Sequence, residues 1–146
     1  MKTQKQGGFL IAKIHQLSGR IFSKLLNEHQ IEINPAQGRI MFVLWRNDNI
    51  TIQELSKKTS LSKTTLTSML DRLESMGYTK RVPSTEDRRK IFIELTEKNQ
   101  VLQDKYVQVS KEMTDLFYRD ISNEEIEKFE NTLEKLYDNL LAYNTK

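Results

Sequence analysis

The chain of 146 residues has no cysteine, only two prolines and five glycines. Without cysteine, disulfides, thiol redox sensing and thiolate zinc sites are excluded, and the composition fits a reducing compartment. The N-terminal segment offers only the apolar patch 9–12 before Lys13, which is too short for a signal peptide or a membrane span. Scarce proline and glycine predict a mostly helical chain. We therefore expect a cytoplasmic, largely helical protein that has no membrane partner.

Charge is unevenly distributed, although the net charge is only +3. Residues 1–59 carry nine Lys or Arg against four acids, and residues 60–96 carry seven against five. Residues 97–146 reverse the balance, with seven cations against eleven acids. This asymmetry indicates an anionic partner for the first two thirds of the chain. Ordinary scatter of surface charge is the alternative.

Apolar spacing and capping residues predict the first helices. Residues 9–29 carry apolar side chains at intervals of three and four, which is typical of an amphipathic helix. Asn34, Pro35 and Gln37 form a start signal for a second helix, which runs to about Arg46. A similar signal at 51–54 opens a short helix that fades near Lys58.

The next segment combines a longer helix with two strands. Ser62 is a capping residue for a helix that ends at Gly77, a natural position for a left-handed C-cap. After Gly77 the apolar period falls to two over residues 78–82 and 90–95, and the polar stretch between them suits a hairpin turn. Two long helices should follow, with Thr96 and Ser122 as their caps.

The helix from Ser62 to Gly77 has one apolar stripe and one hydroxyl-rich face. The stripe consists of Leu66, Met69, Leu70, Leu73 and Met76. The opposite face consists of Thr64, Thr67, Ser68, Asp71 and Ser75, flanked by Lys63 and Arg72. Short side chains let a helix axis approach base edges, and the free N–H groups of the first turn attract phosphate.

The order of helix, short helix, turn, long helix and cationic hairpin is that of a winged helix-turn-helix. Such a helix fits the major groove of double-stranded DNA, and a basic hairpin tip reaches phosphates or the minor groove beside it. Taken singly, a hydroxyl-rich helix face is usually a solvated face, and the charged run 86–90 is usually a solvated loop tip. The two features together, at the spacing of a winged helix, favour DNA binding.

The residues from ITIQELSKKTSLSKTTLTSMLDRLESMGY to DRRKIFIELTEK closely resemble the MarR-type winged-helix transcriptional regulators. The resemblance extends from about Phe9 to Leu141. It implies a mainly α fold with a small β-hairpin wing, divided into a DNA-binding domain at 35–96 and a helical dimerisation region at 1–34 and 97–146. It also implies a homodimer that regulates transcription, as a repressor in our interpretation, from a pseudo-palindromic operator. An intrachain helical bundle is the alternative to the dimer.

The resemblance assigns roles to the wing. Arg89 corresponds to the arginine that enters the minor groove, and Asp87 to the acid that steadies it. Arg88 and Lys90 would then contact phosphates or remain solvated. The predicted DNA-binding residues are Ser62, Lys63, Thr64, Thr65, Thr67, Ser68, Arg72, Arg88, Arg89 and Lys90. Ser60 departs from the family pattern, in which glycine is common, and leaves the conformation of the turn open.

The family often binds small aromatic effectors beside its dimerisation helices, so a small aromatic effector is a possible partner. Candidate contacts are Trp45, Met41, Phe22, Tyr106 and His15, although such residues at helical spacing are more often core. No cofactor or metal is expected, because His15 and His29 lie fourteen residues apart. We expect no enzymatic activity, since no catalytic motif is present. A winged helix that binds only protein is the alternative function.

Overall fold

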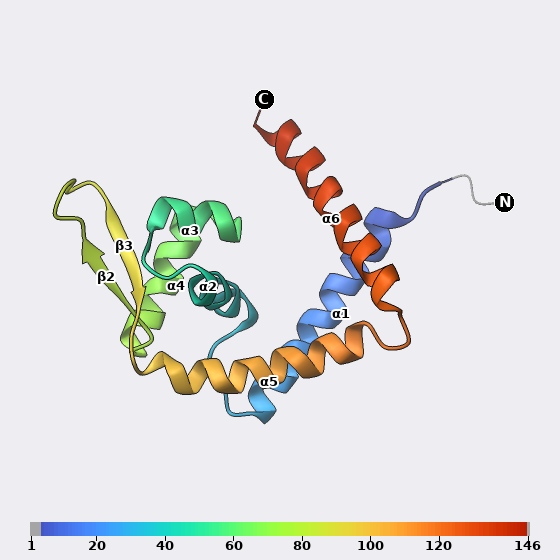
Figure 1. Cartoon of the computed structure of the whole chain (residues 1–146), viewed down its shortest axis with the longest axis horizontal. Coiled ribbons are helices and arrows are strands. Elements are labelled where there is room, and N and C mark those ends of the chain that lie inside the picture. Colours follow the sequence, from blue (N-terminus) through green and yellow to red (C-terminus); the bar gives the residue numbers. More distant parts are fainter. Residues whose placement is uncertain (1–3, 146) are drawn as a thin grey trace. The chain divides into compact units, whose positions relative to one another are not determined.

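The computed structural model describes residues 4–145 and is mostly helical, as predicted (Figure 1). In chain order its elements are α1 (Gly7–Glu28), α2 (Pro35–Arg46), β1 (Ile50–Thr51), α3 (Ile52–Thr59), α4 (Lys63–Ser75), β2 (Thr79–Pro83), β3 (Ile91–Leu95), α5 (Asn99–Phe117) and α6 (Asn123–Asn144). No helix within residues 4–145 has the length and hydropathy needed to cross a membrane. The chain divides after Ser110 into two compact units. The predicted split into dimerisation and DNA-binding regions concerns roles and stays a prediction.

Local capping explains where most helices begin. Asn34 Oδ1 accepts from the Gln37 N–H at 2.7 Å, and Gln37 Oε1 accepts from the Asn34 N–H at 2.9 Å, which completes a capping box at the start of α2. The hydroxyls of Thr51, Ser62 and Ser122 each accept from the N–H three residues later. The predicted starts of these four helices are confirmed.

Helix α5 does not begin where the sequence predicted. We expected Thr96 to cap this helix, but α5 begins at Asn99. The Thr96 hydroxyl donates to the Gly77 carbonyl, and the Thr96 N–H donates to the Tyr78 carbonyl at 3.1 Å. Thr96 therefore joins the segment before α5 to the turn after α4. A local capping pattern does not reveal a carbonyl acceptor nineteen residues away.

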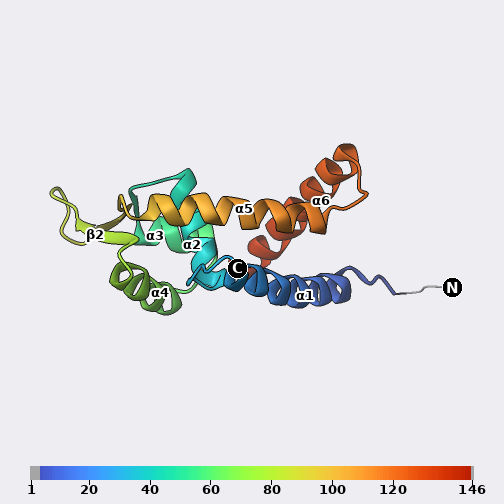
Figure 2. The same cartoon turned by 90° about the horizontal axis from the view of Figure 1, so that it is seen from below.

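Three strands form the sheet, in the order β1–β3–β2. The antiparallel hairpin pairs Thr79 with Leu95 and Pro83 with Ile91 at its two ends, close to the predicted bounds. Sequence analysis missed β1, whose Ile50 pairs with Ile93, because two residues carry no periodicity. In both views the hairpin extends past α4 at one end of the first unit (Figures 1 and 2).

One hydrophobic core unites the first unit. Its apolar members come from all the helices of that unit, from the sheet and from the loop after α1: Leu26, Ile31, Ile33, Ile40, Met41, Leu44, Ile50, Leu55, Leu66, Leu70, Leu73, Ile93, Leu102, Tyr106 and Val109. At the end of α4 the chain turns at Gly77 with φ +87°, which side chains other than glycine rarely adopt. The predicted left-handed position is confirmed.

The second unit has a small aromatic cluster and a largely open helix. The Tyr118 hydroxyl donates to Glu130 Oε2 at 2.7 Å, and its ring packs edge-on against Phe117 and Phe129. Burial, followed by this bond to Glu130, raises the pKa of Tyr118 to about 12. None of the residues of α6 is buried, so its apolar face is exposed within the chain.

Candidate nucleic-acid interface

The apolar stripe of α4 is buried, which turns its hydroxyl face outward. Leu66, Leu70 and Leu73 are at most 1% exposed. On the other side of the helix the exposed predicted DNA-binding residues are Lys63, Thr64, Thr67, Ser68 and Arg72. The side-chain orientation predicted for this helix is therefore present, whereas its contacts with bases or phosphates stay a prediction.

The first turn of α4 uses two of the predicted residues for capping. Ser62 Oγ accepts from the Thr65 N–H at 3.2 Å and donates to Thr65 Oγ1 at 3.0 Å. Thr65 is half-buried, whereas Ser62 is exposed. This pair stabilises the helix start, so any contact of Thr65 with DNA would share a hydroxyl that already has a partner.

The turn between α3 and α4 is well held, although it contains a strained residue. Ser60 adopts the left-handed conformation, with φ 60° and ψ 24°. Beside it, Thr59 Oγ1 donates to the Leu55 carbonyl and Ser56 Oγ donates to the Leu61 carbonyl, both at 2.7 Å. These bonds over-determine the turn and offset a backbone cost of about 1 kcal/mol at Ser60. The conformation left open by the sequence is thus the one that favours glycine.

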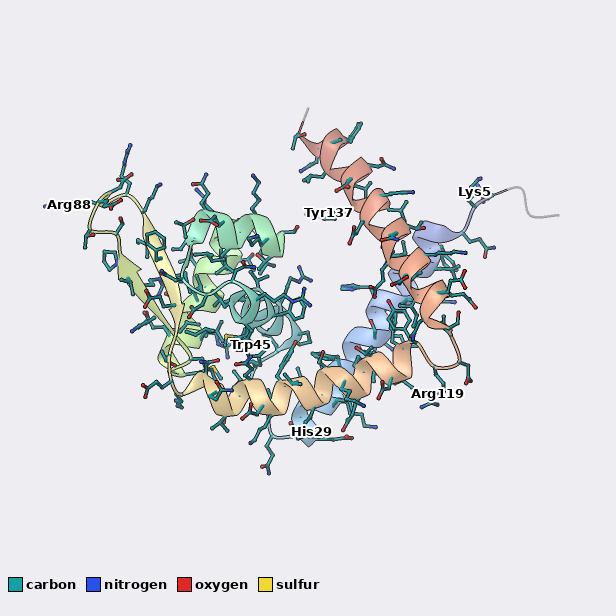
Figure 3. The ribbon with its side chains drawn as sticks, in the orientation of Figure 1. Lys5, His29, Trp45, Arg88, Arg119 and Tyr137 are labelled. Atoms are coloured by element: carbon teal, nitrogen blue, oxygen red, sulfur yellow. The ribbon has the colours of Figure 1, made fainter. Side chains whose placement is uncertain are left out.

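The tip of the wing is an ordered turn. The Ser84 N–H donates to the Lys90 carbonyl, and the Lys90 N–H donates to the Asp87 carbonyl, both at 3.0 Å. Ser84 Oγ accepts from the backbone N–H groups of Glu86 and Asp87 at 3.2 Å. Arg88 points outward from this tip (Figure 3). The turn therefore presents its cations from a hydrogen-bonded frame.

Asp87 holds Arg89 within this frame. Asp87 Oδ1 accepts from the Arg89 backbone N–H at 3.0 Å and from Arg89 Nε at 3.2 Å, and Asp87 Oδ2 accepts from a guanidinium nitrogen at 3.4 Å. The side chain of Arg89 remains 90% exposed. The side-chain bond to Arg89 is the main cause that lowers the pKa of Asp87, so the carboxylate is charged at neutral pH. Arg89 is thus an exposed cation that is hydrogen-bonded to Asp87.

Arg81 on β2 is a positioning residue that sequence analysis missed. Its guanidinium donates to Asp71 Oδ1 at 2.7 Å and to Glu74 Oε2 at 2.9 Å, and its backbone N–H donates to Glu74 Oε1 at 3.0 Å. A third side-chain contact reaches the Thr67 carbonyl at 3.4 Å. These contacts join β2 to the side of α4 that carries Thr67, Asp71 and Glu74. Arg81, Asp71 and Glu74 are all visible as charged residues in the sequence, but only the folded structure shows that they contact one another.

Comparison with known proteins places these features in a family. The MarR family model matches residues 33–91. The chain is 28% identical to the organic hydroperoxide resistance transcriptional regulator of Bacillus subtilis (strain 168), over 99% of this chain and 95% of that protein. It is 33% identical to the multiple antibiotic resistance protein MarR of Escherichia coli (strain K12), over 61% of this chain and 60% of that one.

A solved structure agrees with these sequence matches. A cysteine-to-serine mutant of MarR from E. coli, crystallised with operator DNA, superposes with a TM-score of 0.79 at 27% sequence identity. The superposition covers 88% of this chain and 91% of that one. The chain belongs to the MarR family. It is a helix-turn-helix transcriptional regulator, and the family, the winged-helix fold and this function were all predicted correctly.

The aromatic residues suggested as effector contacts in this MarR-family chain mostly fill the core. Met41 is fully buried, and Tyr106 packs its ring against Phe22 at 5.6 Å and against Trp45 at 5.1 Å. Trp45 Nε1 donates to Asn99 Oδ1 at 2.8 Å, which ties α2 to α5 (Figure 3). His15 lies exposed on α1, apart from the core. Residues 4–145 contain no cluster of three or more side chains suited to a metal ion.

Proposed function

We propose that this MarR-family regulator represses transcription as a homodimer, with α4 of each subunit in the major groove of a half-site and Arg89 in the adjacent minor groove. The observation that carries the proposal is the Asp87–Arg89 pair, because it aims an exposed cation from the tip of an ordered wing. Arginine suits the negative potential of a narrow minor groove. A pseudo-palindromic operator follows from the two-fold symmetry of a dimer.

Roles within the DNA contact follow from side-chain chemistry. Thr64, Thr67, Ser68 and Arg72 face outward on α4 and are assigned to base edges or nearby phosphates. Lys63 at the first turn, with Arg88 and Lys90 on the wing, is assigned to phosphates. Ser62 and Thr65 add hydroxyl and N–H groups at the helix N-terminus.

Exposed apolar side chains support the homodimer. On α1 they are Phe9, Leu10, Ile11, Ile14 and Leu17, and on α6 they are Phe129, Leu136, Leu140 and Leu141. Leu140 is 71% exposed, which is costly for a large apolar side chain that no partner covers. A second copy of the chain would bury these faces. A small aromatic effector that releases the operator, a cytoplasmic location and the lack of a catalytic role complete the proposal.

The relative's hydroperoxide response does not transfer by a thiol mechanism. The Bacillus subtilis protein is named for organic hydroperoxide resistance. This chain has no cysteine, so no sulfenate or disulfide can form in it. A thiol-based peroxide signal is therefore excluded for this regulator.

Operator binding tests the proposal directly. Fragments of genomic DNA retained by the full chain would supply the operator, which is then titrated in gel shifts across a range of salt concentrations. We expect Arg89→Ala to weaken binding by about tenfold or more and to lower the salt slope by about one. The matched control is Arg119→Ala, which removes an exposed cation from the turn before α6.

The partner of Arg89 gives a second arm to the same experiment. Asp87→Ala should weaken operator binding although it removes a negative charge, because Arg89 loses its fixed direction. The double variant should be no weaker than Arg89→Ala alone. Binding by all three variants as tight as that of the wild type, and independent of salt, would refute the role of the wing. Absence of operator binding by the wild-type chain would instead favour the protein-binding alternative.

A further inference from the structure

Residues 95–99, which lead from β3 into α5, contact the end of α2 on one side. Trp45 Nε1, in the last turn of α2, donates to Asn99 Oδ1 at 2.8 Å. The Leu95 N–H donates at 2.9 Å to Oδ1 of Asp48, which lies two residues after α2. These contacts join residues that are 54 and 47 positions apart, so they exist only in the folded chain. We call residues 95–99 the bracket.

On its other side the bracket contacts the end of α4. The Thr96 hydroxyl donates to the Gly77 carbonyl, and the Thr96 N–H donates to the Tyr78 carbonyl at 3.1 Å. Lys98 Nζ donates at 2.8 Å to the carbonyl of Met76, the C-cap residue of α4. The last carbonyls of a helix have no acceptor role inside the helix, so they need partners from elsewhere. The bracket supplies those partners at the end of α4.

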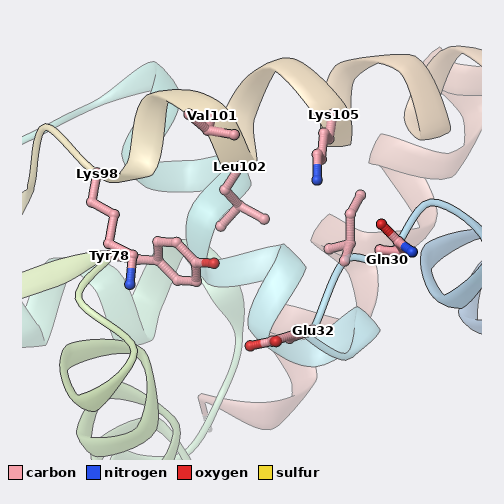
Figure 4. Close-up of a pocket in the computed structure, with 8 residues that line it drawn as sticks. Gln30, Glu32, Tyr78, Lys98, Val101, Leu102 and Lys105 are labelled. Atoms are coloured by element: carbon pink, nitrogen blue, oxygen red, sulfur yellow. The ribbon is translucent and has the colours of Figure 1, made fainter.

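The bracket has an exposed contact and a buried one. Lys98 is exposed and lies beside Tyr78 in the wall of a pocket of about 410 Å³ (Figure 4). The rest of this pocket comes from the turn after α1 and from α5, where Leu102 lines it. Asn99, in contrast, is only 7% exposed. Water can replace a lost contact at Lys98, whereas a lost contact at Asn99 leaves a buried polar group without a partner.

Asn99 uses both halves of its amide. Its Oδ1 accepts from Trp45, and its Nδ2 donates to the Thr96 carbonyl. A buried amide that loses either bond is costly, so both bonds must form together, and few orientations of the bracket against α2 allow this. Leucine would occupy a similar volume without that requirement. The asparagine therefore selects an orientation rather than adding apolar contact.

The two amide bonds and the Thr96 hydroxyl link the last turn of α2 to the residue after the C-cap of α4. The middle of α4 is held by its buried leucines, such as Leu66 and Leu70. Apolar packing is non-directional, whereas hydrogen bonds have preferred distances and angles. The core thus keeps α4 in place, and the bracket fixes the direction in which its end points.

We propose that Asn99 and Thr96 are positioning residues for DNA recognition, which hold the end of α4 against α2 so that its outward side chains meet base edges in register. This inference rests on the proposed placement of α4 in the major groove. Hydrogen bonds to base edges depend on exact placement, whereas attraction to phosphates is electrostatic and independent of sequence. Loss of the bracket contacts therefore lowers discrimination between operator and other DNA.

Two duplexes of equal length test the proposal, the operator retained from genomic DNA and a scrambled version of it. Affinities of the full chain for both are measured by gel shift over a range of salt concentrations, at folded concentrations matched by urea unfolding. We expect Asn99→Leu and Thr96→Val each to lower the ratio of operator to scrambled affinity by about fivefold or more. Affinity for the scrambled duplex and its salt slope should stay at the wild-type values.

Each variant has a matched control. Thr96→Ser keeps the hydroxyl that donates to Gly77 and should keep the wild-type ratio. Gln100→Leu replaces the exposed neighbouring amide, which contacts Asp104 along α5, and should also keep it. An unchanged ratio in both Asn99→Leu and Thr96→Val would overturn the proposal. Equal losses of affinity for the two duplexes would also overturn it, because they would indicate a merely structural role.

The free protein gives a second readout. The chain has a single tryptophan, so its indole N–H contributes one NMR signal. We expect Thr96→Val to shift this signal, because the Thr96 hydroxyl acts on Trp45 through Asn99, and we expect Thr96→Ser to leave it in place. An unshifted signal in Thr96→Val would show that the contacts act separately and would overturn the bracket as a unit.

Failure of this inference is distinct from failure of the proposed function. A wild-type chain that binds the operator no better than the scrambled duplex would count against the proposed function. A wild-type preference that both bracket variants retain would overturn the positioning roles of Asn99 and Thr96 alone.

Discussion

Removal of the Arg81 guanidinium is the sharpest test of how the wing and α4 act together. Arg81→Met retains most of the apolar stem and deletes the contacts to Asp71 and Glu74. The Arg81 side chain is 23% exposed, whereas the two carboxylates are 64% and 42% exposed. Exposed ion pairs contribute about 0.2–1 kcal/mol each, so we expect unfolding free energy to fall by about 1 kcal/mol.

The effect on operator binding should exceed what this small loss of stability suggests. Without Arg81, two carboxylates on α4 lose their cation beside the proposed DNA surface. The variant loses one positive charge, which at about 8 Å in water would attract a phosphate by about 0.5 kcal/mol. This corresponds to about twofold in affinity, before any loss of orientation between β2 and α4 is counted.

Urea unfolding and gel-shift titration measure the two quantities on the same preparations. Lys80→Met is the matched control, because Lys80 neighbours Arg81 on β2 and pairs with Glu94 at 3.7 Å rather than with α4. A triple variant, Arg81→Met with Asp71→Asn and Glu74→Gln, should regain the electrostatic part of the affinity. If Arg81→Met binds the operator as well as Lys80→Met does, the reasoning about this clamp is refuted.

Three further predictions concern the core and the exposed apolar face. Gly38→Ala should destabilise the fold by about 1–2 kcal/mol, because its Cβ would meet the Tyr106 hydroxyl; Gly19→Ala, which meets nothing within 4 Å, should not. Burial raises the pKa of Tyr106 from 10.0 to about 12, so the protonated phenol stabilises the folded state, and this contribution is complete below pH 10. About 2–3 kcal/mol of the unfolding free energy should be lost from this source as pH rises to 12. In urea titrations Tyr106→Phe should lessen the pH dependence by that amount, and the part due to Tyr118 should remain. Leu140→Glu should leave helicity unchanged but give monomers in sedimentation, whereas Glu127→Lys should remain dimeric. A dimeric Leu140→Glu would contradict the proposed interface.

The parts of the fold that sequence predicted are those set by neighbours along the chain. Asn34 and Ser62 cap their helices through the N–H three residues on, so the pattern that identifies them is also the contact they make. Gly77 is equally local, because its left-handed φ depends on its own missing Cβ. Such features can be read residue by residue.

The parts that sequence analysis missed depend on distant partners. Thr96 is a residue type common at helix caps, but its hydroxyl donates to the distant Gly77 carbonyl. Arg81 is one cation among several in the sequence, and only the packing of β2 on α4 selects Asp71 and Glu74 as its partners. The pocket lined by Tyr78, Lys98 and Leu102 could not be predicted from the sequence either, since its walls come from three separate segments.

Helix α4 is held at three points by three different parts of the chain. Its start depends on Ser62, its outer side on Arg81 of β2, and its end on Lys98 in the turn before α5. The first two attachments lie within the winged-helix domain and should move with it as one body. Lys98 instead directly precedes a helix that continues into the second unit. Loss of the Lys98 contact should therefore free the end of α4 while the contacts of Ser62 and Arg81 stay in place.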